Sequence, residues 1–173
     1  MHNVENKFNG KIAILKHNLL KGSIPSIKHD FVFQESNKSG MDYLEIKKNL
    51  QKKYILKKDI KKGNTIQKKD FKKARVGIAI VCRLDSSRLK NKALRKIGSL
   101  TSIEYCIKNV LKLDFIDDVI LATSKNKDDE KLKNYTFNER VKFFRGSKND
   151  LLKRILDVSE KNNLDVICRV TAD

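Results

Sequence analysis

The segment that decides the fold reads Val76-Gly77-Ile78-Ala79-Ile80-Val81-Cys82. A continuous apolar run of this kind is typical of a strand that is buried on both faces of a parallel sheet. Further apolar runs follow it at residues 118–123, 141–144 and 165–170. They alternate with helical patterns at residues 103–111, 128–134 and 150–161. This alternation predicts right-handed βαβ units and a doubly wound, Rossmann-like α/β domain over residues 76–173.

Polar residues follow the first strand directly. The next loop contains three cations, Arg83, Arg88 and Lys92, and two hydroxyls, Ser86 and Ser87. Ligands of doubly wound sheets bind outside the carboxyl ends of the strands, and backbone amides and cations in such a loop can cradle a triphosphate. The loop is therefore a candidate phosphate site. The alternative is a solvated basic loop in a lysine-rich protein.

Two further polar segments lie in this half of the chain. The acidic run Asp128-Asp129-Glu130 is predicted to be the charged first turn of a helix, where the helix dipole favours negative charge. Residues 145–150 are predicted to offer a second anion contact at a helix N-terminus, or alternatively a cap formed by Ser147 or Asn149.

The charge of the chain is strongly positive. Its 173 residues include 39 Lys and Arg against 21 Asp and Glu, which gives a formal net charge of +18. Such a balance raises the question of nucleic-acid binding. However, eight of the cations are Arg, all from residue 75 onward, and aromatic residues are not interleaved with the basic ones. We therefore expect the lysines to lie on solvated faces, and we do not expect nucleic acid as the partner.

Hydropathy and cysteine usage exclude further classes of protein. No apolar run approaches the roughly 18 residues that a membrane-spanning helix needs, and the N-terminus lacks the pattern of a secretory signal. Cys82, Cys106 and Cys168 show no Cys-x-x-Cys spacing, which argues against a disulfide framework or a thiolate metal site. We expect a cytoplasmic protein.

The first half of the chain contains an internal repeat. Residues 14–22, Ile-Leu-Lys-His-Asn-Leu-Leu-Lys-Gly, correspond to residues 55–63, Ile-Leu-Lys-Lys-Asp-Ile-Lys-Lys-Gly, and Phe31 and Phe71 follow the two copies. Each copy predicts a short strand, a turn ending in Gly and a segment that returns to the core. With an amphipathic helix at residues 42–50 between them, the copies predict a compact β domain of residues 10–73 with internal two-fold symmetry.

This segment resembles the SAF (antifreeze-like) domain, a small β-clip domain found at the C-terminus of sialic acid synthases. The likeness includes Lys28-His29-Asp30-Phe31 after the first copy and Lys69-Asp70-Phe71 after the second. In that family an Arg-Pro-Gly segment reaches into a partner subunit and holds the amino-sugar substrate. Glu35 stands at the place of that Arg here, and a carboxylate cannot donate to the same acceptors. The resemblance therefore does not imply that substrate contact for this chain.

The second half resembles cytidylyltransferases, which include spore-coat polysaccharide biosynthesis proteins and, more distantly, CMP-sialic acid synthetases. Residues 82–92 are similar to the Ala-Arg-x-Gly-Ser-Thr-Arg-Leu-Pro-Gly-Lys signature of that family. The likeness continues in the same order through Ile103-Glu104-Tyr105, residues 116–124, Phe144-Arg145-Gly146-Ser147 and residues 167–173.

The resemblance implies a role for each matching residue. The nucleotide phosphates would be held by Arg83, Ser86, Ser87, Arg88 and Lys92. Of these, Arg83 and Lys92 would act as catalytic residues on the reacting phosphate. Thr123 and Ser124 would lie near the base or ribose. Asp173 would bind Mg²⁺.

The sequence departs from the family signature in three places. Asp85 stands where the family has Gly, and Lys90-Asn91 replaces Pro-Gly, so that the turn loses a rigid residue and a glycine. Asp173 ends the chain where the family continues into Cys-Pro and a further half domain. We therefore expect a C-terminally truncated part of a longer protein.

These observations predict a nucleotidyltransferase, an enzyme that moves CMP from CTP to a sugar or nonulosonic acid in sialic acid or surface polysaccharide biosynthesis. The resemblance implies CTP, a sugar acid and Mg²⁺ as ligands, and a homodimer. The alternative is a non-catalytic module that binds sugars or docks onto an enzyme of the sialic acid synthase type.

Overall fold

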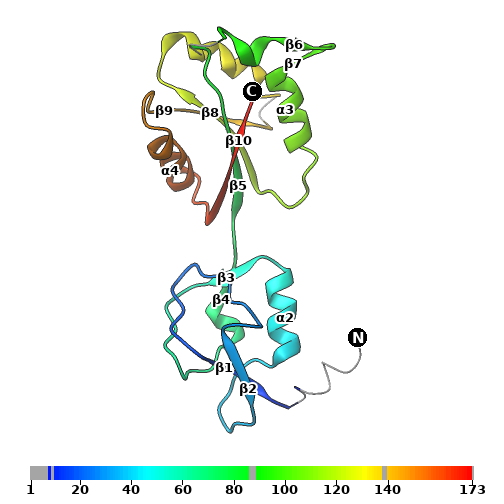
Figure 1. Ribbon diagram of the computed structural model, residues 1–173, viewed down its shortest axis with the longest axis vertical. Helices are drawn as coiled ribbons and strands as arrows, with labels where there is room; N and C mark the ends of the chain where they lie inside the picture. The colour runs from blue at the N-terminus through cyan, green and yellow to red at the C-terminus, as the bar shows by residue number, and fades with distance from the viewer. Residues whose placement is uncertain (1–7, 9, 86–88, 138–139, 173) are drawn as a thin grey trace. The chain divides into compact units, whose positions relative to one another are not determined.

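The computed structural model describes residues 8, 10–85, 89–137 and 140–172 (Figure 1). The chain divides into two compact units, Met1–Ala74 and Arg75–Asp173. Within the described part of the chain, no helix is both long enough and apolar enough to cross a bilayer.

Among the described residues, the second unit has a four-stranded sheet in which all neighbouring strands run parallel, in the order β10-β5-β8-β9. Its strands are β5 (Val76–Val81), β8 (Asp118–Ser124), β9 (Lys142–Gly146) and β10 (Val166–Thr171). All residues of β5 are buried, which its apolar run predicts. The α/β fold with a parallel sheet is therefore confirmed.

Helices follow three of these strands. They are α3 (Ser102–Val110), the 3-10 helix η3 (Lys127–Tyr135) and α4 (Leu151–Lys161). A short hairpin of β6 (Lys96–Ile97) and β7 (Leu100–Thr101) leads into α3. Thr101 and Glu104 form a reciprocal capping box there, which satisfies two backbone amides that the helix itself leaves without acceptors.

The cap of α4 differs from the sequence prediction. Asp150, directly before the helix, accepts a hydrogen bond from the Lys153 amide at 2.8 Å. The prediction of Ser147 or Asn149 as the cap is therefore wrong. The Ser147 hydroxyl instead accepts from the amide of Asp150 at 3.1 Å, so that it shapes the turn that precedes the helix.

Apolar residues fill both faces of the sheet. On one face, Ile80 of β5 belongs to the same buried cluster as Ile103 and Ile107 of α3. On the other, Ala79 of β5 belongs to a cluster with Val158 of α4. Fully burying an isoleucine or valine side chain stabilises the fold by about 1.5–3 kcal/mol. The helices α3 and α4 thus cover opposite faces of the sheet (Figure 1).

The chain reverses its direction across the sheet after β9. From β5 it passes through β8 to β9, and α4 then leads back to β10 on the other side of β5. Ligands of open α/β sheets bind outside the carboxyl ends of the strands, at the point where this order reverses. That point lies at the end of β5, where the loop of the predicted phosphate site begins.

The first unit contains two antiparallel strand pairs and an apolar core. Strand β1 (Ile12–Leu15) pairs with β2 (Phe31–Gln34), and β3 (Tyr54–Leu56) pairs with β4 (Phe71–Lys73). The helix α2 (Tyr43–Gln51) lies between β2 and β3 in the sequence, and the 3-10 helix η1 (Lys68–Asp70) leads into β4. The core gathers side chains from both repeats and from α2, among them Leu15, Ile46 and Leu56.

Each repeat hydrogen-bonds to the other through equivalent positions. The amide of Gly22 donates to the carbonyl of Leu56 and that of Gly63 to the carbonyl of Leu15, both at 2.9 Å. Between these contacts, Leu19 and Ile60 exchange two backbone hydrogen bonds, of 2.9 and 2.8 Å. The backbone therefore has the two-fold symmetry that the repeat predicts. Membership of this unit in the SAF family stays a prediction.

The two equivalent glycines give a test of this symmetry. Gly22 and Gly63 have φ angles of +83° and +79°, and a Cβ at either position would have no atom within 4 Å. The substitutions Gly22→Ala and Gly63→Ala should therefore act through backbone strain alone, and each should lower the free energy of unfolding of this unit by about 1 kcal/mol. Native-state hydrogen exchange of residues 12–34 and 54–73 measures this cost.

Lys62→Ala serves as the control, because Lys62 is exposed in the same turn and has an ordinary backbone conformation. It should change the stability of the unit by less than about 0.5 kcal/mol. A cost for one glycine substitution but not for the other would contradict the equivalence of the two turns.

Candidate functional site

The loop after β5 lies at the carboxyl edge of the sheet. Arg83 is exposed, Leu84 is buried and Asp85 is partly exposed. Three of the predicted phosphate-binding residues, Ser86, Ser87 and Arg88, lie outside the described residues. The sequence prediction for them is therefore unchanged.

The loop ends in a turn that keeps a left-handed residue. Asn91 has a φ of +54° at the position where the family signature has Gly. Asn tolerates this conformation better than most residues do, because its short polar side chain can hydrogen-bond locally. Asn91 thus takes the positive φ that the glycine of the family signature would be expected to take. Lys92 follows as the first residue of the 3-10 helix η2 (Lys92–Leu94).

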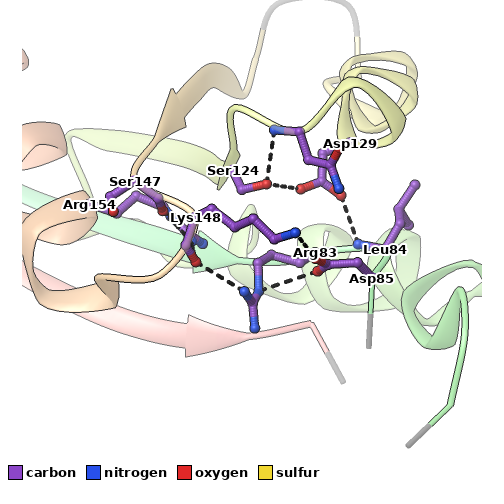
Figure 2. Close-up of polar contacts among 9 residues, drawn as sticks. Arg83, Leu84, Asp85, Ser124, Asp129, Ser147, Lys148 and Arg154 are labelled. Atoms are coloured by element: carbon purple, nitrogen blue, oxygen red, sulfur yellow. Dashed lines mark hydrogen bonds and ion pairs between the residues drawn. The ribbon is translucent and has the colours of Figure 1, made fainter. Parts of the chain in front are cut away.

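Arg83 and Lys148 hold the carboxylate of Asp85 between them (Figure 2). The Nζ of Lys148 lies 3.1 Å from one Asp85 oxygen, and the Nε of Arg83 lies 3.7 Å from the other. Arg83 also donates through Nη1 to the carbonyl oxygen of Lys148 at 3.0 Å. These contacts, which we call the Asp85 bridge, join the loop after β5 to the loop after β9.

The charge of Asp85 is stabilised within this bridge. The hydrogen bond from Lys148 is the main reason that the pKa of Asp85 lies below its ordinary value, and the charge of Arg83 acts in the same direction. Asp85 is therefore ionised at neutral pH, and its negative charge offsets part of the positive charge at this edge of the sheet.

A buried carboxylate fixes the same loop from the other side. Asp129 of η3 has no exposed surface and accepts a hydrogen bond from the amide of Leu84 at 2.8 Å. Its second oxygen accepts from the Ser124 hydroxyl (Figure 2). Residues 128–130 do lie in the first turn of η3, as the sequence predicts. Within that turn the Asp129 side chain points into the protein, where it accepts from two donors.

Arg154 of α4 shapes the loop after β9. Its side chain is 2% exposed and donates from Nε to the carbonyl of Ser147 at 2.8 Å and from Nη2 to the carbonyl of Lys148 at 3.2 Å. Burial, followed by the nearby charge of Arg83, lowers the pKa of Arg154. A guanidinium stays protonated even so. Arg154 is thus a positioning residue that fixes the loop carrying Lys148.

Two predicted ligands of the base or ribose are buried. Thr123 and Ser124, at the end of β8, have no exposed surface. The Thr123 hydroxyl has no hydrogen-bond partner among the described residues, whereas the Ser124 hydroxyl donates to Asp129 and accepts from the amide of Asn126 at 3.1 Å. Ser124 therefore has a structural task here. A direct nucleotide contact for either residue stays a prediction.

The described residues do not by themselves fit a resident metal ion. Within that part of the chain, no group of three or more His, Cys, Asp or Glu side chains is placed to hold one. Asp173, the predicted Mg²⁺ ligand, lies outside the described residues. Magnesium usually retains several waters and binds through one or two carboxylates together with substrate phosphates, so that a metal here would depend on the ligand.

A cavity of about 450 Å³ borders the loop after β5. Its lining includes Asp85, Lys90 and Asn91 from this loop and Asp128 and Lys131 from η3. The cavity therefore leaves room for a ligand beside the loop.

Sequence reasoning missed three residues that build this edge: Asp129, Lys148 and Arg154. A signal for Lys148 was present, since the segment 145–150 had the pattern of an anion contact and the carboxyl ends of parallel strands share one edge. The inward direction of Asp129 had no such signal, because an acidic residue in a helical turn is typically solvated.

Comparisons with known proteins identify the family of the second unit. The sequence profile of the cytidylyltransferase family matches residues 78–173. Over 98 residues the chain is 38% identical to an uncharacterized protein of Methanocaldococcus jannaschii, a match that covers 57% of this chain and 40% of that protein. Over 98 residues it is 32% identical to the spore coat polysaccharide biosynthesis protein SpsF of Bacillus subtilis, covering 54% of this chain and 41% of SpsF.

A solved structure shows the same fold. The structure of a cytidylyltransferase from Leptospira borgpetersenii serovar Hardjo-bovis superposes with a TM-score of 0.54 at 33% identity, over 58% of this chain and 42% of that one. The chain belongs to the cytidylyltransferase family. It spans about two fifths of the length of these relatives.

The role of Asp129 in fixing the loop gives a prediction. Asp129→Ala should leave the buried amide of Leu84 without an acceptor, and should lower the free energy of unfolding of the second unit by about 2 kcal/mol. Chemical denaturation measures this loss, and hydrogen exchange should show faster exchange of the Leu84 amide.

Asp128→Ala is the matched control, because the neighbouring Asp128 is exposed. It should change the unfolding free energy by no more than about 0.5 kcal/mol. Equal effects of the two substitutions would show that Asp129 acts through its charge in the helical turn and not through the Leu84 amide.

Proposed function

We propose that the second unit is the nucleotide-binding part of an enzyme that transfers CMP from CTP to a sugar or a nonulosonic acid in surface polysaccharide biosynthesis. Family membership over residues 78–173 is the observation that carries this proposal. The relative SpsF, named as a spore coat polysaccharide biosynthesis protein, supports the polysaccharide context.

The geometry of the carboxyl edge supports nucleotide binding. Arg83 and Lys148 keep 43% and 52% of their side-chain surfaces exposed, so that both cations can reach a ligand from solution. A guanidinium and an ammonium together suit the oxygens of a polyphosphate. In the proposed enzyme Arg83 neutralises charge on the reacting phosphate, and Lys92 acts beside it.

The proposed reaction is a substitution at phosphorus. An oxygen of the sugar acid forms a bond to the α-phosphorus of CTP, the bond from that phosphorus to the bridging oxygen of the β-phosphate breaks, and pyrophosphate leaves with the electron pair. The proton of the attacking hydroxyl goes to solvent. Such a reaction depends mainly on positioned phosphates and on cations that stabilise the developing charge.

Further parts of the proposal concern the whole enzyme. Mg²⁺ would be bound by Asp173 together with phosphate oxygens, and no step above is derived through it. We expect a homodimer in the cytoplasm, with a sugar acid as the second substrate. The first unit is proposed to serve as a SAF-like module of the same enzyme.

Titration calorimetry of the chain with CTP, with ATP for comparison, tests the proposal. CTP should bind more tightly than ATP, and Arg83→Gln should weaken CTP binding by roughly tenfold or more because a charge-assisted hydrogen bond to phosphate is lost.

Arg140→Gln is the matched control. Arg140 is exposed two residues before β9, near the amino end of that strand. Its loss should change CTP affinity by less than about twofold, because salt screens charges beyond a Debye length. Absence of CTP binding would overturn the proposal that the second unit is the nucleotide-binding part, and would favour a docking or sugar-binding module.

A further inference from the structure

The Asp85 bridge has the arrangement of a bound anion. Two cations from different loops approach the two oxygens of one carboxylate, at 3.1 Å from Lys148 and 3.7 Å from Arg83. A phosphate group would present its oxygens to the same pair of donors. The anion in this place belongs to the chain itself, at a position where the family signature has a residue without a side chain.

All three side chains of the bridge are open to solvent. Asp85 keeps 27% of its side-chain surface exposed, against 43% for Arg83 and 52% for Lys148. A dissolved anion can therefore reach the two cations without unfolding any element. Asp85 also lines the cavity beside the loop, so that its carboxylate has space into which it can turn.

The Asp85 bridge is weak enough for a bound anion to displace the Asp85 carboxylate. An exposed ion pair changes the equilibrium between its closed and open arrangements by at most about fivefold. The Asp85 bridge contains two such pairs. A ligand that carries several negative charges can compensate for their loss, because it gains contacts to both cations at once. Because the hydrogen bond from Lys148 lowers the pKa of Asp85, the carboxylate stays negatively charged throughout the neutral range.

We propose that Asp85 is a built-in competitor of phosphate at this edge of the sheet: a polyphosphate binds Arg83 and Lys148 only by displacing the Asp85 carboxylate. Asp85 thereby limits the affinity of the site for phosphate chains. This inference goes beyond CMP transfer, because it concerns any phosphate chain that reaches the two cations, whatever base it carries.

Calorimetric titration of the full chain with inorganic triphosphate tests the inference without any contribution from a base. Asp85→Asn keeps the shape of the side chain and removes its charge, and should bind triphosphate about five- to tenfold more tightly than the unchanged chain. Circular dichroism checks that the variant is folded.

Asp128→Asn is the control for net charge. Asp128 lines the same cavity and has the same charge, but it takes no part in the Asp85 bridge. Its loss should tighten triphosphate binding by less than about twofold, since the charge is exposed and screened. If Asp85→Asn tightens binding no more than Asp128→Asn does, the inference is wrong.

A double-mutant cycle with Lys148→Ala tests competition for the same cation. Lys148→Ala should weaken triphosphate binding more in the Asp85→Asn background than in the unchanged chain, where Asp85 already occupies Lys148. Equal weakening in both backgrounds would overturn the inference.

The outcomes separate this inference from the proposed function. Tighter triphosphate binding in Asp85→Asn without any preference for CTP over ATP would overturn CMP transfer and support the built-in competitor. A preference for CTP with unchanged triphosphate affinity in Asp85→Asn would do the reverse.

Discussion

Burial of β5 on both faces is the constraint on which the second unit depends. The strand supplies alternate side chains to two apolar clusters, one under α3 and the other under α4. No position along it can therefore hold a solvated polar group. Polar chemistry begins where the strand ends, and Arg83 is the first exposed side chain after it. The reversal of strand order at this point leaves the carboxyl edge open for a ligand.

The loop that carries Arg83 is fixed by neighbours that are distant in the sequence. Asp129 accepts from the backbone of Leu84, and the Asp85 bridge joins the loop to Lys148. Arg154 in turn holds the carbonyl groups of the loop that carries Lys148. Three connections thus meet at one edge, because parallel strands all end on the same side of their sheet. The positive charge gathered there is partly balanced by Asp85 before any ligand arrives.

The first unit is small, and its two repeats depend on each other for their hydrogen bonds and their core. Each of its two repeats is too short to satisfy its own turn, and the amides of Gly22 and Gly63 find their acceptors in the opposite copy. Reciprocal pairing closes both turns with the same set of bonds. The two halves consequently share one apolar core, and the lysines that separate the apolar residues in the two copies remain exposed.

The sequence by itself determined the elements and the edge where chemistry gathers. The apolar run of β5, the helical period of α3 and the duplicated turn motif are local patterns, and the structure bears them out because each pattern sets which face of its element is buried. Tertiary structure decided the contacts within the site. The Asp129 side chain is buried, the Ser124 hydroxyl donates to it, and Lys148 forms an ion pair with Asp85. These depend on distances between loops separated by up to 65 positions in the chain, and no local pattern encodes such distances. From the sequence alone a charged residue is expected to be solvated, because only the folded structure shows whether a partner for it lies nearby.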